Sequence, residues 1–108
     1  LLKQLAYDLP AGITATANGF YGPQGRRLRI PLAFPELNER IEGFRFGEYK
    51  ISNFEMETSA LFGLGKSLGH NTLTICTIIA NRLTKQFSED YKVSVDKMIR
   101  LVLERLTS

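Results

Sequence analysis

The chain has 108 residues, of which 44% are hydrophobic and 23% charged, a composition typical of one folded globular domain. Its formal charge of +3 is only mildly basic, and acidic residues are interspersed with the basic ones after residue 30, which argues against a dedicated nucleic-acid binder. No run approaches the roughly 20 apolar residues that a membrane-spanning helix needs. The single cysteine, Cys76, excludes an internal disulfide and lies in an apolar run, which predicts a buried thiol and a reducing, cytoplasmic compartment.

The first half of the chain is predicted to alternate short elements with loops. Residues 1–9 are predicted to be the end of a helix, and the β-branched and small residues at 13–18 predict a strand. Residues 19–27 hold three glycines and a proline, which indicate a loop after that strand. Residues 28–33 are predicted to be an edge strand, because Pro31 cannot donate in a central ladder. A short helix is then expected over residues 34–43, with Pro35 in its first turn, followed by a connector at residues 44–50.

The centre of the chain predicts a strand that runs directly into a helix. The strand covers residues 51–56, and leucines at helical spacing then lead to a stop at Gly69. Two carboxylates, Glu55 and Glu57, flank Met56 at the junction. Because ligands of α/β proteins bind outside the carboxyl ends of the strands, this junction is where chemistry is expected.

The last third predicts one strand and one helix. Residues 72–80 are almost continuously apolar and β-branched, which is typical of a strand covered on both faces. A polar connection at residues 83–90 precedes an amphipathic helix at residues 93–107, for which Ser94 is a suitable cap. The order of elements is that of an α/β fold. Two or three strands make only a thin sheet, which predicts that the chain forms part of a larger one.

Three polar segments follow the predicted strands, and in a parallel sheet their carboxyl ends would bring them to one edge. The segments are Phe20-Tyr-Gly-Pro-Gln-Gly-Arg26, Asn53-Phe-Glu-Met-Glu-Thr-Ser-Ala60 and Ile78-Ile-Ala-Asn-Arg82. In this order they resemble the C-terminal half of the uridine-cleaving members of the nucleoside phosphorylase family, from about Gly12 to the C-terminus. The resemblance implies part of a three-layer α/β fold with a mixed sheet flanked by helices. Residues 1–108 would then form a single partial domain, the C-terminal portion of the catalytic domain.

The resemblance implies that the glycine-rich loop binds the base. Phe20 would pack against the pyrimidine ring, while Gln24 and Arg26 would hydrogen-bond the uracil carbonyls and ring nitrogen. These two residues would be catalytic, because they would stabilise negative charge on the leaving base. The loop departs from the commonest family spelling, so Arg26 and Arg27 could exchange roles. A solvated surface loop with an incidental charge pair is the alternative interpretation.

The Met-Glu step at the strand-to-helix junction resembles the ribose-binding signature of the family. Met56 would line the ribose, Glu57 would accept hydrogen bonds from its hydroxyls, and Glu55 would be a second carboxylate near the sugar. The alternative is that these acids merely complement the positive end of a helix dipole.

The third segment bears on which base is bound. Ile79 and Ala80 would border the base, and Arg82 would lie behind it unless it forms a structural ion pair. Purine-specific relatives carry Ser-Asp where this chain has Asn81-Arg82, and the acid there serves the purine ring nitrogen. The absence of this acid from the present chain favours uracil over adenine or hypoxanthine.

The reaction that the resemblance implies is phosphate-dependent cleavage of uridine to uracil and ribose 1-phosphate, with phosphate as co-substrate and no cofactor or metal. The family also implies a homo-oligomer, a hexamer built from dimers, without nucleic-acid or membrane partners. The family's phosphate-site motifs are absent from these 108 residues, so the isolated chain is expected to be inactive. The alternatives are a purine nucleoside phosphorylase or nucleosidase, a non-catalytic nucleoside-binding domain, and a small α/β interaction module.

Overall fold

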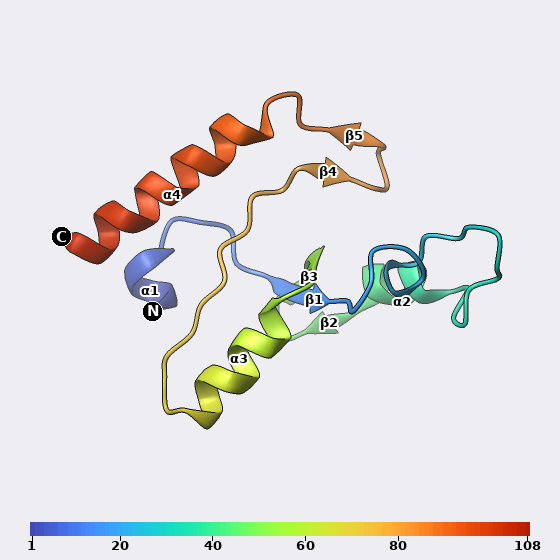
Figure 1. The fold of residues 1–108 in the computed structure, drawn as a ribbon, viewed down its shortest axis with the longest axis horizontal. Helices are drawn as coiled ribbons and strands as arrows, with labels where there is room; N and C mark the ends of the chain where they lie inside the picture. Colours follow the sequence, from blue (N-terminus) through green and yellow to red (C-terminus); the bar gives the residue numbers. More distant parts are fainter. The chain divides into compact units, whose positions relative to one another are not determined.

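The computed structural model describes residues 1–108, which divide into two compact units. One unit is Pro10–Thr72, and the other combines Leu1–Leu9 with Leu73–Ser108. Figure 1 shows the elements of both units in sequence colours. The expectation of a single partial domain stays a prediction.

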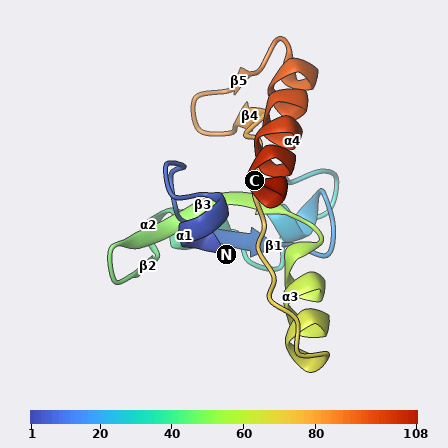
Figure 2. The same cartoon turned by 90° about the vertical axis from the view of Figure 1, so that its left-hand side faces the viewer.

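The unit Pro10–Thr72 contains a small mixed sheet. Strands β1 (Ile13–Thr16) and β3 (Tyr49–Glu55) pair in parallel, and β2 (Arg45–Phe46) pairs antiparallel with β3, so the strand order is β1-β3-β2. Figures 1 and 2 show β1 alongside β3 in two views. The mixed sheet with helices agrees with the predicted α/β class, and the three-layer arrangement stays a prediction.

Strands β2 and β3 form a hairpin that the sequence prediction missed. Residues 44–50 were expected to be a connector, but Arg45 pairs with Lys50 and Phe46 with Tyr49. The two-residue turn between them begins with Gly47 at a φ of 59°, a positive angle that glycine adopts without strain and that tight hairpin turns require.

Two helices and one 3-10 turn complete this unit. They are η1 (Gly22–Gln24), α2 (Leu37–Gly43) and α3 (Thr58–Ser67), and α3 confirms the predicted strand-to-helix junction. Helix α2 contacts β3 and begins at Leu37, so the predicted start at residue 34, with Pro35 in the first turn, is wrong, whereas the predicted end at Gly43 is confirmed. Residues 28–33 form no strand, because they join no ladder; Pro31 offers no N–H for one.

In the second unit, α1 (Leu2–Leu5) packs against α4 (Tyr91–Thr107). Arg105 holds the two together: its guanidinium donates to the carbonyl oxygen of Leu5 at 2.7 Å and to Asp8 at 2.8 Å. The same guanidinium lies 4.6 Å from the centre of the Tyr7 ring. Its hydrogen bond lowers the pKa of the Asp8 carboxyl despite opposing desolvation.

Helix α4 begins earlier than predicted and uses a different cap. Its first residue is Tyr91, and the Asp90 carboxylate accepts a hydrogen bond from the backbone N–H of Val93 at 3.4 Å. The expected cap, Ser94, lies inside the helix. An acid in this position satisfies an N–H that has no intrahelical partner, which explains why the helix extends back to Asp90.

The strand predicted over residues 72–80 is largely absent. Only Ala80–Asn81 (β4) is a strand, paired antiparallel with β5 (Gln86–Phe87), and no ladder includes residues 72–79. The backbone N–H and C=O groups of a strand need hydrogen-bond partners on a neighbouring strand, and an apolar sequence pattern does not guarantee that such a strand is present. Without covered faces Cys76 is exposed, so the prediction of a buried thiol is also wrong.

The apolar core is small. The buried apolar residues are Leu5, Ala6 and Ala17, and no large side chain is fully buried. The leucines whose spacing predicted α3 are exposed, and the last of them is the residue after its final turn: Leu61, Leu64 and Leu68. No helix has the length and apolar character that crossing a bilayer would require.

Candidate functional site

Two of the three predicted site segments begin at the same edge of the sheet. Because β1 and β3 are parallel, the loop after β1 and the junction after β3 leave the sheet at the same end. The backbone N–H of Ala17 donates to the carbonyl oxygen of Glu55 at 2.9 Å, which continues the pairing one residue beyond β1. The loop at residues 20–26, which was predicted to bind the base and is called the base loop below, therefore follows a strand that ends at the same edge of the sheet as the strand before the Met-Glu junction.

The base loop is held in shape by its own backbone. The N–H of Gln24 and the N–H of Arg26 both donate to the carbonyl oxygen of Tyr21, at 3.1 and 2.9 Å. Gly25 closes the 3-10 turn at a φ of 70°, and any side chain there would collide with Asn38. This positive φ explains why a glycine stands at this position.

Three predicted base ligands form one cluster within the loop. The Arg26 guanidinium donates to the carbonyl oxygen of Phe20 at 2.5 Å and to the side-chain oxygen of Gln24 at 2.6 Å. It also lies 3.8 Å from the centre of the Phe20 ring, where a cation and an aromatic face attract each other. Gln24 is buried and Arg26 half-buried. Arg27 is exposed, so of the two arginines Arg26 is the one placed beside Gln24.

Aromatic rings stand at the surface of the same loop. Phe20 and Tyr21 meet edge to face, with ring centres 5.2 Å apart and planes at 88°. Both rings remain about half exposed. An exposed aromatic pair beside an amide and a guanidinium can take a flat, polar ring: the rings offer stacking, and the two polar groups offer directional hydrogen bonds.

At the Met-Glu junction, Glu55 is surrounded by hydrogen-bond donors. One carboxylate oxygen accepts from the backbone N–H of Glu57 at 2.7 Å and of Thr58 at 2.6 Å. The other oxygen accepts from the Thr16 hydroxyl, whose oxygen in turn accepts from the N–H of Ser59 at 3.0 Å. Thr16 was not among the predicted site residues. The signal for it was its place at the carboxyl end of β1, in register with Glu55.

These contacts determine how Glu55 titrates. Desolvation acts to raise the pKa of the carboxyl, but the hydrogen bonds from Thr16 and from the junction residues outweigh it and lower the pKa from 4.5 to about 2. Glu55 is therefore ionised at any pH near neutrality.

The other two junction residues face outwards. Glu57 is the N-cap residue of α3, yet its own carboxylate makes no capping hydrogen bond and is exposed. Met56 is exposed as well. At the junction, therefore, the Glu55 carboxylate is hydrogen-bonded within the fold, whereas the Glu57 carboxylate is exposed and makes no capping hydrogen bond. The flexible apolar side chain of Met56 lies between them in sequence.

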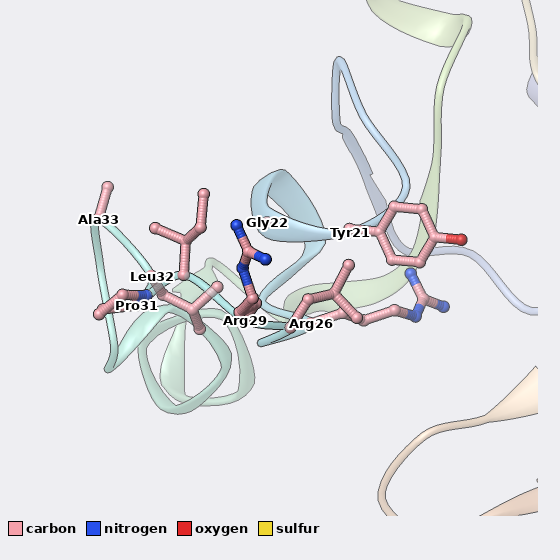
Figure 3. A pocket seen from close by; sticks show the side chains of 9 residues that line it. Tyr21, Gly22, Arg26, Arg29, Pro31, Leu32 and Ala33 are labelled. Carbon is pink, nitrogen blue, oxygen red and sulfur yellow. The ribbon is translucent and has the colours of Figure 1, made fainter.

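A cavity of about 410 Å³ adjoins the base loop, and Figure 3 shows the side chains around it. Arg26 is the one predicted site residue that lines it. Tyr21, Gly22 and the segment at residues 28–33 supply the rest, including Arg29. Residues 28–33 were predicted to be a strand. As an irregular, bent segment outside the sheet they instead form a largely apolar wall.

The third predicted segment belongs to the other unit. Ile79 is exposed, Ala80 opens strand β4, and Arg82 is half-buried at the start of the hairpin loop. Asn81 shapes that loop, because its side-chain oxygen accepts from the N–H groups of Leu83 at 3.0 Å and Thr84 at 3.2 Å. The roles of Ile79, Ala80 and Arg82 at the base stay predictions.

Nowhere in the chain do three or more histidine, cysteine, aspartate or glutamate side chains gather as a metal ion would require. The chemistry that the described arrangement offers is recognition of a polar ring by the base loop and acceptance of hydroxyl hydrogen bonds by Glu57.

Comparison with known proteins adds an independent finding. Residues 1–107 match the family model described as "Phosphorylase superfamily". A uridine phosphorylase from Thermococcus kodakarensis is 32% identical over 84 residues, which are 72% of this chain and 27% of that protein. Purine nucleoside phosphorylases of the DeoD type from Bacillus thuringiensis and Bacillus mycoides are 28% identical over 106 residues, 96% of this chain and 42% of each of those proteins. The chain thus spans less than half the length of these relatives. No solved structure matches it.

Proposed function

This chain belongs to the phosphorylase superfamily, and on that premise we propose that it is the C-terminal part of an enzyme that cleaves uridine with phosphate to give uracil and ribose 1-phosphate. In this proposal phosphate is a co-substrate, no cofactor takes part, and the enzyme is a cytoplasmic homo-oligomer, a hexamer built from dimers. Relatives named for uridine and for purine nucleosides are similar to the chain at comparable identity. The comparisons therefore do not distinguish the two bases, and the choice of uracil rests on the residues of this chain.

One observation carries the proposal: the base loop, whose groups suit a flat polar ring, and the exposed Glu57 carboxylate both follow strands that end at the same edge of the sheet. The base loop supplies Gln24 and Arg26 within one hydrogen-bonded cluster, and the adjacent junction supplies the exposed Glu57. A nucleoside has the same two parts, a flat polar ring joined to a hydroxyl-bearing sugar. The spatial pairing therefore supports a nucleoside as substrate.

The proposed mechanism uses these groups at the moment when the glycosidic bond breaks. As phosphate attacks the sugar carbon, the base leaves with negative charge, and the Gln24 amide and Arg26 guanidinium would stabilise that charge. Glu57 would hold the ribose hydroxyls and fix the geometry of the sugar. Phe20 would lie against the pyrimidine, with Met56 along the ribose. Ile79 and Ala80 would border the base, and Arg82 would lie behind the base.

The purine alternative has a specific basis in the comparison with the Bacillus enzymes. Against it stands Asn81-Arg82, which provides no carboxylate for a purine ring nitrogen. A non-catalytic nucleoside-binding protein would keep the base loop and Glu57 without turnover.

The test uses the full-length protein with uridine and inosine as parallel substrates in phosphate buffer. The proposal expects cleavage of uridine, with inosine cleaved at least about 100-fold more slowly, since a hydrogen-bonding site strongly rejects a ring that leaves its polar groups unpaired. Preference for inosine would establish the purine alternative, and binding of uridine without cleavage would establish the non-catalytic one. The isolated 108-residue chain is expected to be inactive in the same assay.

A further inference from the structure

We propose that Glu55 is a positioning residue: together with Thr16 it fixes the turn that presents Met56 and Glu57, and it does not itself bind the sugar. For its kinetic test this inference rests on the proposed function. For its structural test it rests only on contacts inside the unit Pro10–Thr72.

The two oxygens of Glu55 are already occupied. A carboxylate has about four acceptor sites. Here one oxygen takes two backbone N–H groups, those of Glu57 and Thr58, and the other takes the Thr16 hydroxyl. The Thr58 side chain is a fourth hydrogen-bond partner of the same carboxylate. A sugar hydroxyl would have to displace one of these donors, all of which are fixed by the fold. Glu57, by contrast, is exposed and makes no capping bond, so it can accept sugar hydroxyls without breaking any contact.

The Glu55 contacts join three elements of the fold. Thr16 ends β1, Glu55 ends β3, and the N–H groups of Glu57, Thr58 and Ser59 open α3. The first N–H groups of a helix have no intrahelical partner and are usually capped by a side chain. Here Glu55 caps two of them, and Thr16, whose hydroxyl donates to Glu55, accepts from the N–H of Ser59.

Because Glu55 and Thr16 cap the helix, the Glu57 carboxylate is not needed as a cap. Glu57 stands at the N-cap position, where its carboxylate could itself turn towards uncapped N–H groups. While Glu55 accepts hydrogen bonds from those N–H groups, the Glu57 carboxylate gains nothing by turning back onto the helix. Loss of Glu55 would expose the helix end and draw Glu57 away from the sugar. The low pKa of Glu55 is consistent with a permanently charged cap.

The kinetic test compares uridine with 2′-deoxyuridine, which lacks one of the sugar hydroxyls. In the full-length protein, Glu55→Gln and Thr16→Val are expected to lower kcat/KM for both substrates by the same factor, between about 10- and 100-fold, because a misplaced Glu57 harms every substrate. Thr16→Ser keeps the hydroxyl and should restore the rate. Glu57→Gln, the control for a direct sugar ligand, should lower kcat/KM more for uridine than for 2′-deoxyuridine.

Two kinetic results would overturn the proposal. One is that Glu55→Gln changes the ratio of the two substrates as Glu57→Gln does, which would make Glu55 a sugar ligand. The other is that Glu55→Gln leaves both rates unchanged.

The structural test needs no activity. Amide hydrogen exchange at Glu57 and Thr58 should be about fivefold faster in Glu55→Ala, the factor that corresponds to loss of a typical helix cap. Amides of the paired strands β1 and β3, which lie in the same unit, serve as the internal check that the variant is folded. Glu57→Ala is the matched control that should leave exchange at Thr58 unchanged. Unchanged exchange in Glu55→Ala would refute the capping role. If the protein cleaves no nucleoside, the proposed function fails, and the exchange data still decide the role of Glu55.

Discussion

Acidification is expected to lower the free energy of unfolding through one carboxylate, Glu55. Its pKa in the folded chain is about 2, against an ordinary value of 4.5. Because the folded state holds the ionised form, Glu55 stabilises the fold above pH 4.5 and loses this contribution as the pH falls towards 2. The full shift is equivalent to about 3 kcal/mol, and solvent screening of a half-buried group reduces it to about 1–2 kcal/mol.

The assay is urea denaturation of the wild-type protein and of Glu55→Gln between about pH 7 and about pH 3. Gln cannot ionise, so the variant lacks the titrating contribution and should be less stable at neutral pH. The difference in free energy of unfolding between the two proteins should shrink by more than half on acidification. A difference that stays constant across this range would refute the reasoning, because it would mean that Glu55 titrates with an ordinary pKa.

Two further matched pairs test the geometry of the junction helix and of the base loop. Gly63→Ala should raise the free energy of unfolding by up to about 1 kcal/mol, since nothing lies near its added methyl. Gly65→Ala should lower it by about 1–3 kcal/mol, because the methyl would collide with Thr72. Thermal denaturation measures both, and equal effects would contradict the packing of α3. In uridine cleavage, Arg26→Lys should lower kcat about 100-fold and Arg27→Lys should have little effect, because a lysine cannot keep both hydrogen bonds and the ring contact. The reverse order would assign the base contact to Arg27.

The elements that the sequence predicted well are those whose signals are local. Strand β3 runs into α3 because an apolar run is followed directly by a helical leucine spacing, and both signals lie within about 20 residues. The base loop was predictable from its glycines and proline alone. The hairpin at Gly47 was missed, because only two residues of each strand pair across the turn, too few to give a recognisable strand pattern.

The features that the sequence could not predict depend on partners far along the chain. Residues 72–80 have the composition of a buried strand, but composition cannot supply the neighbouring strand that a ladder needs. The role of Thr16 depends on a register that pairs it with Glu55, 39 residues away. The hydrogen bonds of Glu55 to the start of α3 also depend on the fold of the junction and were not predicted, while the expectation that Glu55 lies near the ribose stays a prediction.

The loss of α4's predicted cap follows a different rule. Ser94 and Asp90 are both good capping residues, and a sequence pattern places a helix start only to within a few residues. The structure selects Asp90, whose carboxylate reaches the N–H of Val93.

The measurement that tests the central claim most directly is analysis of the products when the full-length protein acts on uridine, with and without phosphate. The account predicts that uracil forms only when phosphate is present and that it appears with an equal amount of ribose 1-phosphate. Uracil released with free ribose in the absence of phosphate would contradict phosphorolysis and indicate a hydrolase. No uracil under either condition, with inosine cleaved instead, would contradict the assignment of the base.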